Sequence, residues 1–244
     1  MKKIAIVLAG GTGSRHGGPL PKQFAGINGR PVLWWSMKRF YDEDPTINII
    51  VVMHPDFTGE WDRLTGELNE TEKIPHYLCE GGGSRTDSVK NGLRFLHKLI
   101  GENNWEEMDV MVAIHDAARP MVSPELIKRG WDVVSHGIGA VPVVESTSSL
   151  RLLKEEERGE PLEIRQSIPV DRSLIMEVQT PQIFSYTDLK IMYDGNLRES
   201  FTDDAGLAQL KGIAISLFKG DTENFKITNP RDSMIADFLL KEKG

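Results

Sequence analysis

The sequence predicts an α/β fold of three layers, with a mostly parallel twisted sheet between helices on both faces. Short apolar segments rich in β-branched residues alternate with segments of helical periodicity, which is the pattern of parallel strands joined by crossover helices. The length of 244 residues lies within the range of a single large α/β unit. We therefore expect one domain over residues 1–244, with a projecting β-arm at about residues 145–171.

The predicted strands are nearly continuous apolar runs, as expected for strands covered on both faces. The first covers residues 3–9 and leads directly into a glycine-rich loop. Many nucleotide-binding α/β domains begin in this way. The other predicted strands are residues 47–53, 109–114, 139–143 and 214–218.

The predicted helices lie among these strands, and local residues mark where several of them begin. Pro31, Pro124 and Pro230 suit the first turn of a helix, and Ser84 and Ser123 suit the N-cap position. The predicted helices are residues 32–41, 57–68, 85–100, 124–135, 186–197 and 230–241.

Residues 145–171 interrupt the alternation of strands and helices. Two stretches with strand character flank the charged sequence KEEERGEP, which predicts two strands joined by an exposed turn. Because the Leu, Ile and Val side chains of such an arm would otherwise lie in solvent, we expect it to pack on a second subunit of a homodimer. The alternative is a mobile, solvated hairpin.

Composition excludes several classes of function. The net charge of −7 disfavours nucleic acid and anionic lipid surfaces as general partners, so an anionic ligand needs a local cluster of cations. Cys79 is the only cysteine, which excludes an intramolecular disulfide and any multi-cysteine metal site. The apolar start ends after six residues and no run approaches the roughly 18 residues of a membrane span. We expect a soluble, cytoplasmic protein.

The glycine-rich loop, LAGGTGSRHGGPLPKQF at residues 8–24, fails two familiar phosphate-binding patterns. His16 stands where the third glycine of G-x-G-x-x-G is required, which argues against an NAD-dependent oxidoreductase. Pro19 and Leu20 stand where a Walker motif requires Lys and Ser or Thr.

The same loop provides two cations, Arg15 and Lys22, beside glycines whose backbone N–H groups can face a phosphate. This combination indicates a triphosphate site. The alternative is a tight corner after the first strand, with both cations solvated.

Asp116 follows the apolar segment DVMVAI, so it should lie at the carboxyl end of a parallel strand, where ligands bind in such sheets. There it could accept hydrogen bonds from substrate hydroxyls or approach a magnesium ion. Arg119 lies three residues further on and would add positive charge. We interpret His115 as a structural histidine rather than an acid–base group.

Several motifs resemble one enzyme family. GGTGSR followed by PKQ is the opening of cytidylyltransferases that act on small sugar-alcohol phosphates, and the chain resembles the 2-C-methyl-D-erythritol 4-phosphate cytidylyltransferases of non-mevalonate isoprenoid biosynthesis. Further motifs follow in the family's order: GGGSRTDSV, HDAARP, VDR, QTPQIF, TDDA and NFKIT. The departures are few: Gly83 and Ser84 stand where many members have acidic residues, and His16 stands where Met is common.

The resemblance implies a nucleotide-diphosphosugar transferase-like fold and transfer of the CMP group of CTP to the alcohol phosphate, with release of pyrophosphate. It implies Mg²⁺ held mainly by the CTP phosphates, with no dedicated protein metal site. The residues that it implies, by role, are Lys22 and Arg15 for catalysis; Ala9, Gly10, Gly11, Thr12, Gly13, Gly82, Arg85 and Ser88 for the nucleotide; and Asp116, Arg119, Arg172, Thr180, Thr202 and Lys226 for the alcohol phosphate. Arg172 would come from the other subunit, on the arm.

Other functions remain open at this point. Ribitol-5-phosphate cytidylyltransferase shares the glycine loop and the TPQ turn, although VDR and TDDA look closer to the methylerythritol branch. A sugar-1-phosphate nucleotidyltransferase is disfavoured by the short chain. From another class, a CTP-binding sensor without catalysis would keep the fold, but it would have no need of Arg172 and Lys226.

Overall fold

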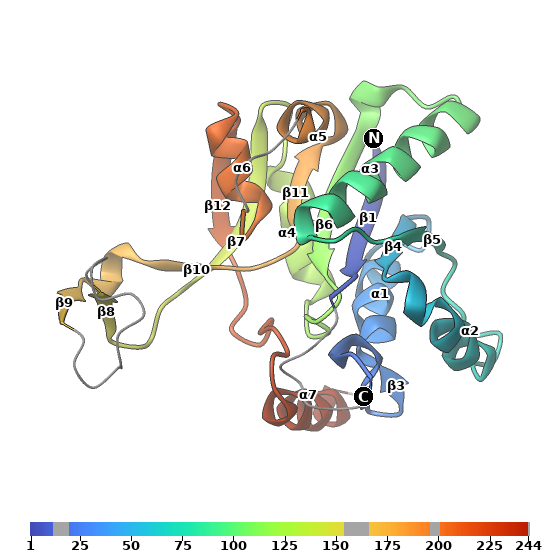
Figure 1. The fold of residues 1–244 in the computed structure, drawn as a ribbon, viewed down its shortest axis with the longest axis horizontal. Helices are drawn as coiled ribbons and strands as arrows, with labels where there is room; N and C mark the ends of the chain where they lie inside the picture. Colours follow the sequence, from blue (N-terminus) through green and yellow to red (C-terminus); the bar gives the residue numbers. More distant parts are fainter. Residues whose placement is uncertain (12–19, 154–165, 196–200, 244) are drawn as a thin grey trace.

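The computed structural model describes residues 1–11, 20–153, 166–195 and 201–243, and an eight-stranded sheet forms its centre (Figure 1). The strands are β1 (Lys2–Ala9), β4 (Asn48–Met53), β5 (Tyr77–Glu80), β6 (Val110–Asp116), β7 (Ile138–Glu145), β10 (Met176–Val178), β11 (Gln182–Ser185) and β12 (Ala214–Lys219). Their order is β10-β7-β11-β6-β1-β4-β5, and β12 pairs with β7. The pairs β1–β4, β1–β6, β4–β5 and β7–β12 are parallel, which confirms the predicted mostly parallel sheet.

Three strands of the sheet escaped the sequence analysis. β11 has only four residues, too few for periodicity to show, and it lies antiparallel between β6 and β7. β10 is shorter still, with exposed side chains, and runs antiparallel to β7. β5 is an edge strand whose side chains are mostly exposed, so it lacks the apolar run that marked the other strands.

Helices cover both faces of the sheet, as predicted (Figure 1). The α-helices of the described residues are α1 (Val32–Glu43), α2 (Thr58–Gly66), α3 (Arg85–Glu102), α4 (Pro124–Val133), α5 (Tyr186–Tyr193), α6 (Asp204–Leu210) and α7 (Pro230–Lys243). Of these, α7 packs on Ile27 and Val32 in a separate cluster. The Oγ atoms of Ser84 and Ser123 accept hydrogen bonds from backbone N–H groups in the first turns of α3 and α4, which confirms both predicted caps. α5 ends at Tyr193, earlier than predicted, and the short α6 was not predicted.

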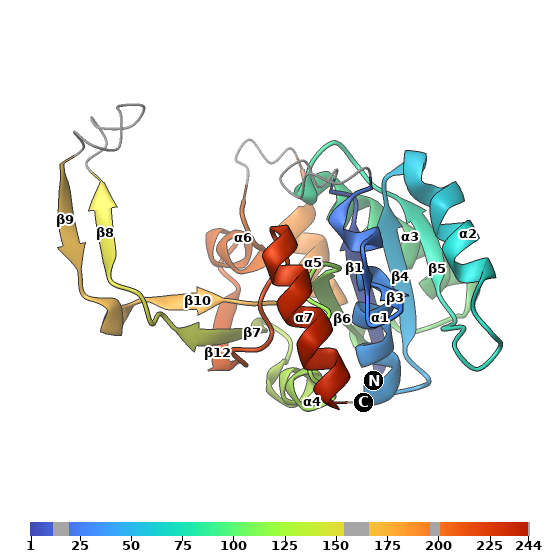
Figure 2. The same ribbon diagram turned by 90° about the horizontal axis from the view of Figure 1, so that it is seen from below.

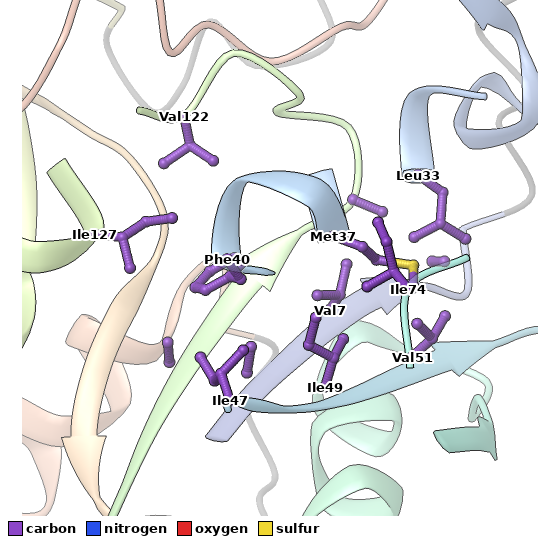
Figure 3. Close-up of a cluster of buried hydrophobic side chains, with 14 of the residues drawn as sticks. Val7, Leu33, Met37, Phe40, Ile47, Ile49, Val51, Ile74, Val122 and Ile127 are labelled. Carbon is purple, nitrogen blue, oxygen red and sulfur yellow. The ribbon is translucent and has the colours of Figure 1, made fainter. Parts of the chain in front are cut away.

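The alternation of side chains along β1 divides the core into two. Ala5, Val7 and Ala9 face a cluster that α1 and α4 complete, whereas Ile4 and Ile6 face a cluster formed with α3, α5 and α6. Figure 3 shows part of the first cluster, where Met37 and Phe40 of α1 lie against the sheet. Burial on both faces holds β1 at the centre of the sheet. The position of its last residue, Ala9, is therefore fixed, and the glycine-rich loop begins directly after it.

A separate two-stranded sheet stands apart from this body (Figure 2). β8 (Leu150–Leu153) and β9 (Ser167–Val170) pair antiparallel, with Leu150 opposite Val170. The charged turn expected between them, KEEERGEP at residues 154–161, lies outside the described residues. Among the described helices, none has the length and apolar character needed to cross a membrane.

Candidate active site

A cleft of about 470 Å³ opens at the carboxyl ends of β1 and β6, beside the loop that follows β5. This is the edge of a parallel sheet where ligands are expected. The residues that line it are Leu8, Ala9, Gly10, Gly11, Lys22, Gln23, His54, Gly82, Gly83, Ser84, Arg85, Ser88, Asp116, Ala117, Ala118, Lys226 and Thr228. The cleft therefore brings together most of the described residues that the sequence motifs singled out.

The start of the glycine loop is held by a side chain that the sequence analysis quoted without assigning a role. Gln23 is buried, and its Nε2 donates hydrogen bonds to the backbone oxygens of Ala9 and Gly11, each at 2.8 Å. These two bonds clamp the backbone on either side of Gly10. Lys22 precedes Gln23 in the short helix η1 (Lys22–Phe24) and lines the cleft. The predicted residues Thr12, Gly13 and Arg15 lie outside the described residues.

The second glycine loop, Gly81 to Gly83 after β5, packs tightly on the start of α3. The backbone N–H of Gly82 donates to Ser88 Oγ at 3.1 Å, and that hydroxyl donates to the Ser84 backbone oxygen at 2.9 Å. A Cβ atom on Gly82 would lie 2.3 Å from the Cβ of Asp87. Close packing against Asp87 therefore favours glycine at position 82, whether or not a ligand also lies close to it.

Asp116 lies at the end of β6, as predicted, with three cations around its carboxylate. Lys226 Nζ lies 2.8 Å from its Oδ2, and the Nε atoms of Arg85 and Arg119 lie 3.8 Å from its Oδ1 and Oδ2 respectively. Burial alone would raise the pKa of Asp116, but the charges of Lys226 and Arg85 outweigh burial and hold it well below its ordinary value. The carboxylate therefore stays ionised and cannot act as a proton donor near neutral pH.

Arg119 lies behind Asp116 rather than in the cleft. Its Nη1 donates to the Asn224 backbone oxygen at 2.7 Å and its Nη2 donates to the Val178 backbone oxygen at 3.4 Å. Burial lowers the pKa of this guanidinium. Arg119 thus ties the end of β6 to the segment that follows β12, the segment that also contains Lys226.

Arg85 lines the cleft but is also bound to a buried carboxylate. Its Nη1 and Nη2 donate to Oδ1 and Oδ2 of Asp204 at 3.1 and 2.6 Å. Burial would lower the pKa of Arg85, yet the charge and hydrogen bonds of Asp204 outweigh it and raise the pKa above its ordinary value. The Tyr193 hydroxyl also donates to Asp204 Oδ1.

His115 is a structural histidine, as predicted. It is fully buried, with Nε2 3.2 Å from the Arg119 backbone oxygen and Nδ1 3.0 Å from Thr180 Oγ1. Burial lowers the pKa of His115 to about 4, so the ring is neutral at physiological pH. Thr180 is buried beside it and its Oγ1 accepts from the Asp116 backbone N–H at 3.1 Å, so Thr180 holds the end of β6 from behind.

Two further residues expected at the alcohol phosphate, Arg172 and Thr202, also lie outside the cleft of their own chain. Arg172 belongs to the short helix η6 (Arg172–Leu174), is exposed, and donates from Nη1 to the Thr147 backbone oxygen at 2.8 Å. Thr202 is exposed before α6, and Asp203, not Thr202, is the N-cap of that helix. Neither Arg172 nor Thr202 lines the cleft in the described part of the chain.

Neither His54 nor a role for Asp204 was predicted from the sequence. His54 directly follows β4 and lines the cleft, so the rule that located Asp116, a polar residue after a parallel strand, would have found it. Asp204 was inside a quoted motif, but nothing local shows that it is fully buried and paired with a residue 119 positions away.

The cleft can bind an anion in a protein whose average charge is negative. Lys22, Arg85 and Lys226 supply positive charge along its walls, and backbone groups of the two glycine loops lie beside them. Among the described residues, no group of three or more His, Cys, Asp or Glu side chains is arranged to hold a metal ion.

Comparisons with known proteins agree on one family. The family model of 2-C-methyl-D-erythritol 4-phosphate cytidylyltransferase (IspD) matches residues 3–242. The 2-C-methyl-D-erythritol 4-phosphate cytidylyltransferases of Bacteroides thetaiotaomicron and Bacteroides fragilis are 34% and 35% identical, over 98% of this chain and 100% of theirs. The crystal structure of the Thermus thermophilus enzyme of that name has a TM-score of 0.71 at 26% identity, over 99% of this chain and 100% of that one.

Proposed function

The chain belongs to the 2-C-methyl-D-erythritol 4-phosphate cytidylyltransferase family, and we propose that the cleft at the ends of β1 and β6 is its active site. It is a CTP-dependent cytidylyltransferase that transfers the CMP group of CTP to 2-C-methyl-D-erythritol 4-phosphate, forming 4-diphosphocytidyl-2-C-methyl-D-erythritol and pyrophosphate. The observation that supports this place for the reaction is the arrangement of both glycine loops, Lys22, Asp116 and Lys226 around one cleft.

The reaction needs positive charge more than it needs a base. The phosphate of the alcohol is already an anionic nucleophile at neutral pH, and one of its oxygens attacks the α-phosphorus of CTP while the bond to the leaving pyrophosphate breaks. The barrier comes from bringing one anion onto another, and preorganised cations reduce it. The ionised Asp116 and the neutral, buried His115 are consistent with a mechanism that has no acid–base residue.

Within this mechanism Lys22 and Arg15 neutralise the charge that develops on the α-phosphate and on the leaving pyrophosphate. Support for Lys22 comes from its place in the cleft, directly before the Gln23 clamp of the glycine loop. The role of Arg15 rests on the family motif alone. The nucleotide lies along Ala9, Gly10 and Gly11 on one side and Gly82, Arg85 and Ser88 on the other. The nucleotide roles of Thr12 and Gly13, like that of Arg15, rest on the family motif.

Mg²⁺ fits this site as an ion held mainly by the CTP phosphates. Asp116 is the one carboxylate among the described lining residues, and it is already bonded to Lys226 at 2.8 Å. Mg²⁺ commonly binds through substrate phosphates with only one or two protein carboxylates. When bound, the ion would supply further charge neutralisation of the triphosphate.

The alcohol phosphate would occupy the end of the cleft around Asp116 and Lys226, where one group can accept from hydroxyls and the other can bind the phosphate. Arg172 lies outside the cleft of its own chain, which supports its assignment to the site of a second copy. Exposed apolar side chains near it also favour a homodimer: Leu152 and Ile168 of the β8–β9 sheet are 58% and 51% exposed, and Leu174 is 80% exposed.

An experiment that separates this enzyme from a CTP sensor is heat denaturation combined with pyrophosphate detection. CTP and MgCl₂ should raise the melting temperature, and addition of 2-C-methyl-D-erythritol 4-phosphate should release pyrophosphate. Stabilisation by CTP with no pyrophosphate release would identify a sensor and contradict the proposed active site.

A further inference from the structure

We propose that Asp204 is a positioning residue for the nucleotide: it fixes the guanidinium of Arg85 in the cleft and limits the contact of Arg85 with Asp116 to the Nε atom, at 3.8 Å. The inference rests on the proposed function, because it concerns the CTP side of the same cleft. Asp204 itself does not line the cleft; it begins α6, behind Arg85. Its action on the nucleotide is therefore through Arg85.

The contact between these residues is a buried ion pair with two hydrogen bonds. Asp204 is 0% exposed, and its oxygens lie 2.6 and 3.1 Å from the two Nη atoms of Arg85. A carboxylate in the interior is tolerated only with such partners, and two parallel N–H···O bonds fix the plane of the guanidinium. Arg85, a side chain with several rotatable bonds, is thereby held in one orientation.

Tyr193 is a further partner of Asp204. Its hydroxyl donates to Asp204 Oδ1, the same oxygen that accepts from Arg85 Nη1. Burial and the adjacent carboxylate raise the pKa of Tyr193 well above its ordinary value, so the hydroxyl keeps its proton and remains a donor. α5, α6 and the first residue of α3 therefore meet at one carboxylate.

The orientation of Arg85 matters because Asp116 is its other carboxylate neighbour. With both Nη atoms engaged by Asp204, only Nε faces Asp116, at 3.8 Å, while Lys226 holds Asp116 at 2.8 Å. Without the charge of Asp204, Arg85 would turn its Nη atoms toward Asp116 and compete with Lys226. Asp204 thus holds the Nη atoms of Arg85 away from Asp116, so that Lys226 stays nearer to the Asp116 carboxylate than Arg85 does.

The test compares the conservative variant Asp204→Asn with wild type in steady-state kinetics and in calorimetric titration with CTP and MgCl₂. We expect the KM and the dissociation constant for CTP to rise about tenfold while kcat changes less than about threefold, because the lost interaction orients a binding group. In an Arg85→Gln background the same change should have no further effect on either constant, since Asp204 acts through Arg85. Unchanged constants in Asp204→Asn, or a full additional loss in the Arg85→Gln background, would overturn the proposal.

A matched control is Asp188→Asn, which makes the same change at another buried carboxylate. Asp188 Oδ2 accepts from the Gly137 backbone N–H at 2.8 Å, and Asp188 does not line the cleft. The Asp188→Asn variant should keep the wild-type KM for CTP even if its melting temperature falls.

If Asp204→Asn does not fold, the variant Tyr193→Phe tests the proposal instead. It removes one hydrogen bond to Asp204 and should raise the CTP dissociation constant about threefold. An unchanged dissociation constant would overturn the proposal.

Pyrophosphate release tests the proposed function, whereas the CTP dissociation constant tests the role of Asp204. Wild-type protein that binds CTP but releases no pyrophosphate would contradict the function, and the dissociation constants of the variants would still test Asp204. Wild-type protein that does not bind CTP would overturn both.

Discussion

The ammonium group of Lys226 lies 2.8 Å from Oδ2 of Asp116, and this contact joins the segment after β12 to the end of β6. The two residues are 110 positions apart in the chain, yet together they place one positive and one negative group at the same point of the cleft. A sugar-alcohol phosphate has the complementary groups, a phosphate and several hydroxyls.

The first prediction concerns this pair. Lys226→Met should raise the KM for 2-C-methyl-D-erythritol 4-phosphate about tenfold or more and leave the KM for CTP within about threefold, because it removes a charged donor from the alcohol-phosphate end. Steady-state kinetics with each substrate varied in turn would measure both values. Lys241→Met is a matched control, since Lys241 is an exposed lysine that pairs with Asp237 within α7 and does not line the described part of the cleft. A selective rise in the KM for CTP would place the nucleotide, not the alcohol phosphate, at Lys226.

The second prediction concerns Lys22. Lys22→Ala should leave a folded protein whose turnover is lower by about a hundredfold or more, because a preorganised cation in the transition state is lost. Pyrophosphate release at saturating substrates would measure the turnover, and heat denaturation would check the fold. Turnover near the wild-type value would remove Lys22 from the centre of the mechanism.

The third prediction concerns pH. His115 has a pKa of about 4 in the folded protein, below the value of about 6.5 usual for an exposed histidine. Between these pH values the unfolded chain binds a proton that the folded chain does not, so the free energy of unfolding should fall as pH decreases from about 6.5 to about 4.

Urea denaturation at several pH values would measure this loss. His115→Gln should show a shallower decline over the same interval, whereas His136→Gln, at an exposed position, should follow the wild-type curve. Equal slopes for wild type and His115→Gln would show that other groups govern the pH dependence.

The fourth prediction concerns the second glycine loop. Gly82→Ala should lower the free energy of unfolding by about 1–3 kcal/mol, because its Cβ would lie 2.3 Å from the Cβ of Asp87 and the loop must shift. In Gly83→Ala the added atom would meet none of the described residues within 4 Å, so stability should change by less than about 0.5 kcal/mol. Chemical denaturation of both variants gives the comparison, and equal stability of the two would show that the loop yields without cost.

The fifth prediction concerns Arg172. If it serves the site of the partner, a mixture of Lys22→Ala and Arg172→Ala subunits should form heterodimers with one intact site. Random exchange of subunits would then restore about a quarter of the wild-type activity. Verified heterodimers with no recovery of activity would mean that each site is built within one chain.

Features that depend on residues close together in the sequence could be predicted from the sequence alone. Asp116 could be placed because an apolar run before it predicts a parallel strand, and such strands end at one edge of the sheet. Ser84 and Ser123 could be placed as caps because capping depends on residues within one turn.

Features that depend on contacts between distant segments could not be predicted in this way. The pairing of Arg85 with Asp204 joins residues 119 positions apart, and the burial of Asp204 has no local sign. β11 is four residues long and gains its place only through pairing with β6 and β7. Thr180 was assigned to the substrate from its motif, whereas packing places it behind Asp116, bonded to His115.

The most direct test of the account is pyrophosphate release from CTP and MgCl₂ with 2-C-methyl-D-erythritol 4-phosphate and ribitol 5-phosphate offered separately. We expect rapid release with the first and at least about a hundredfold lower kcat/KM with the second. Equal or greater activity with ribitol 5-phosphate, or no release with either compound, would contradict it.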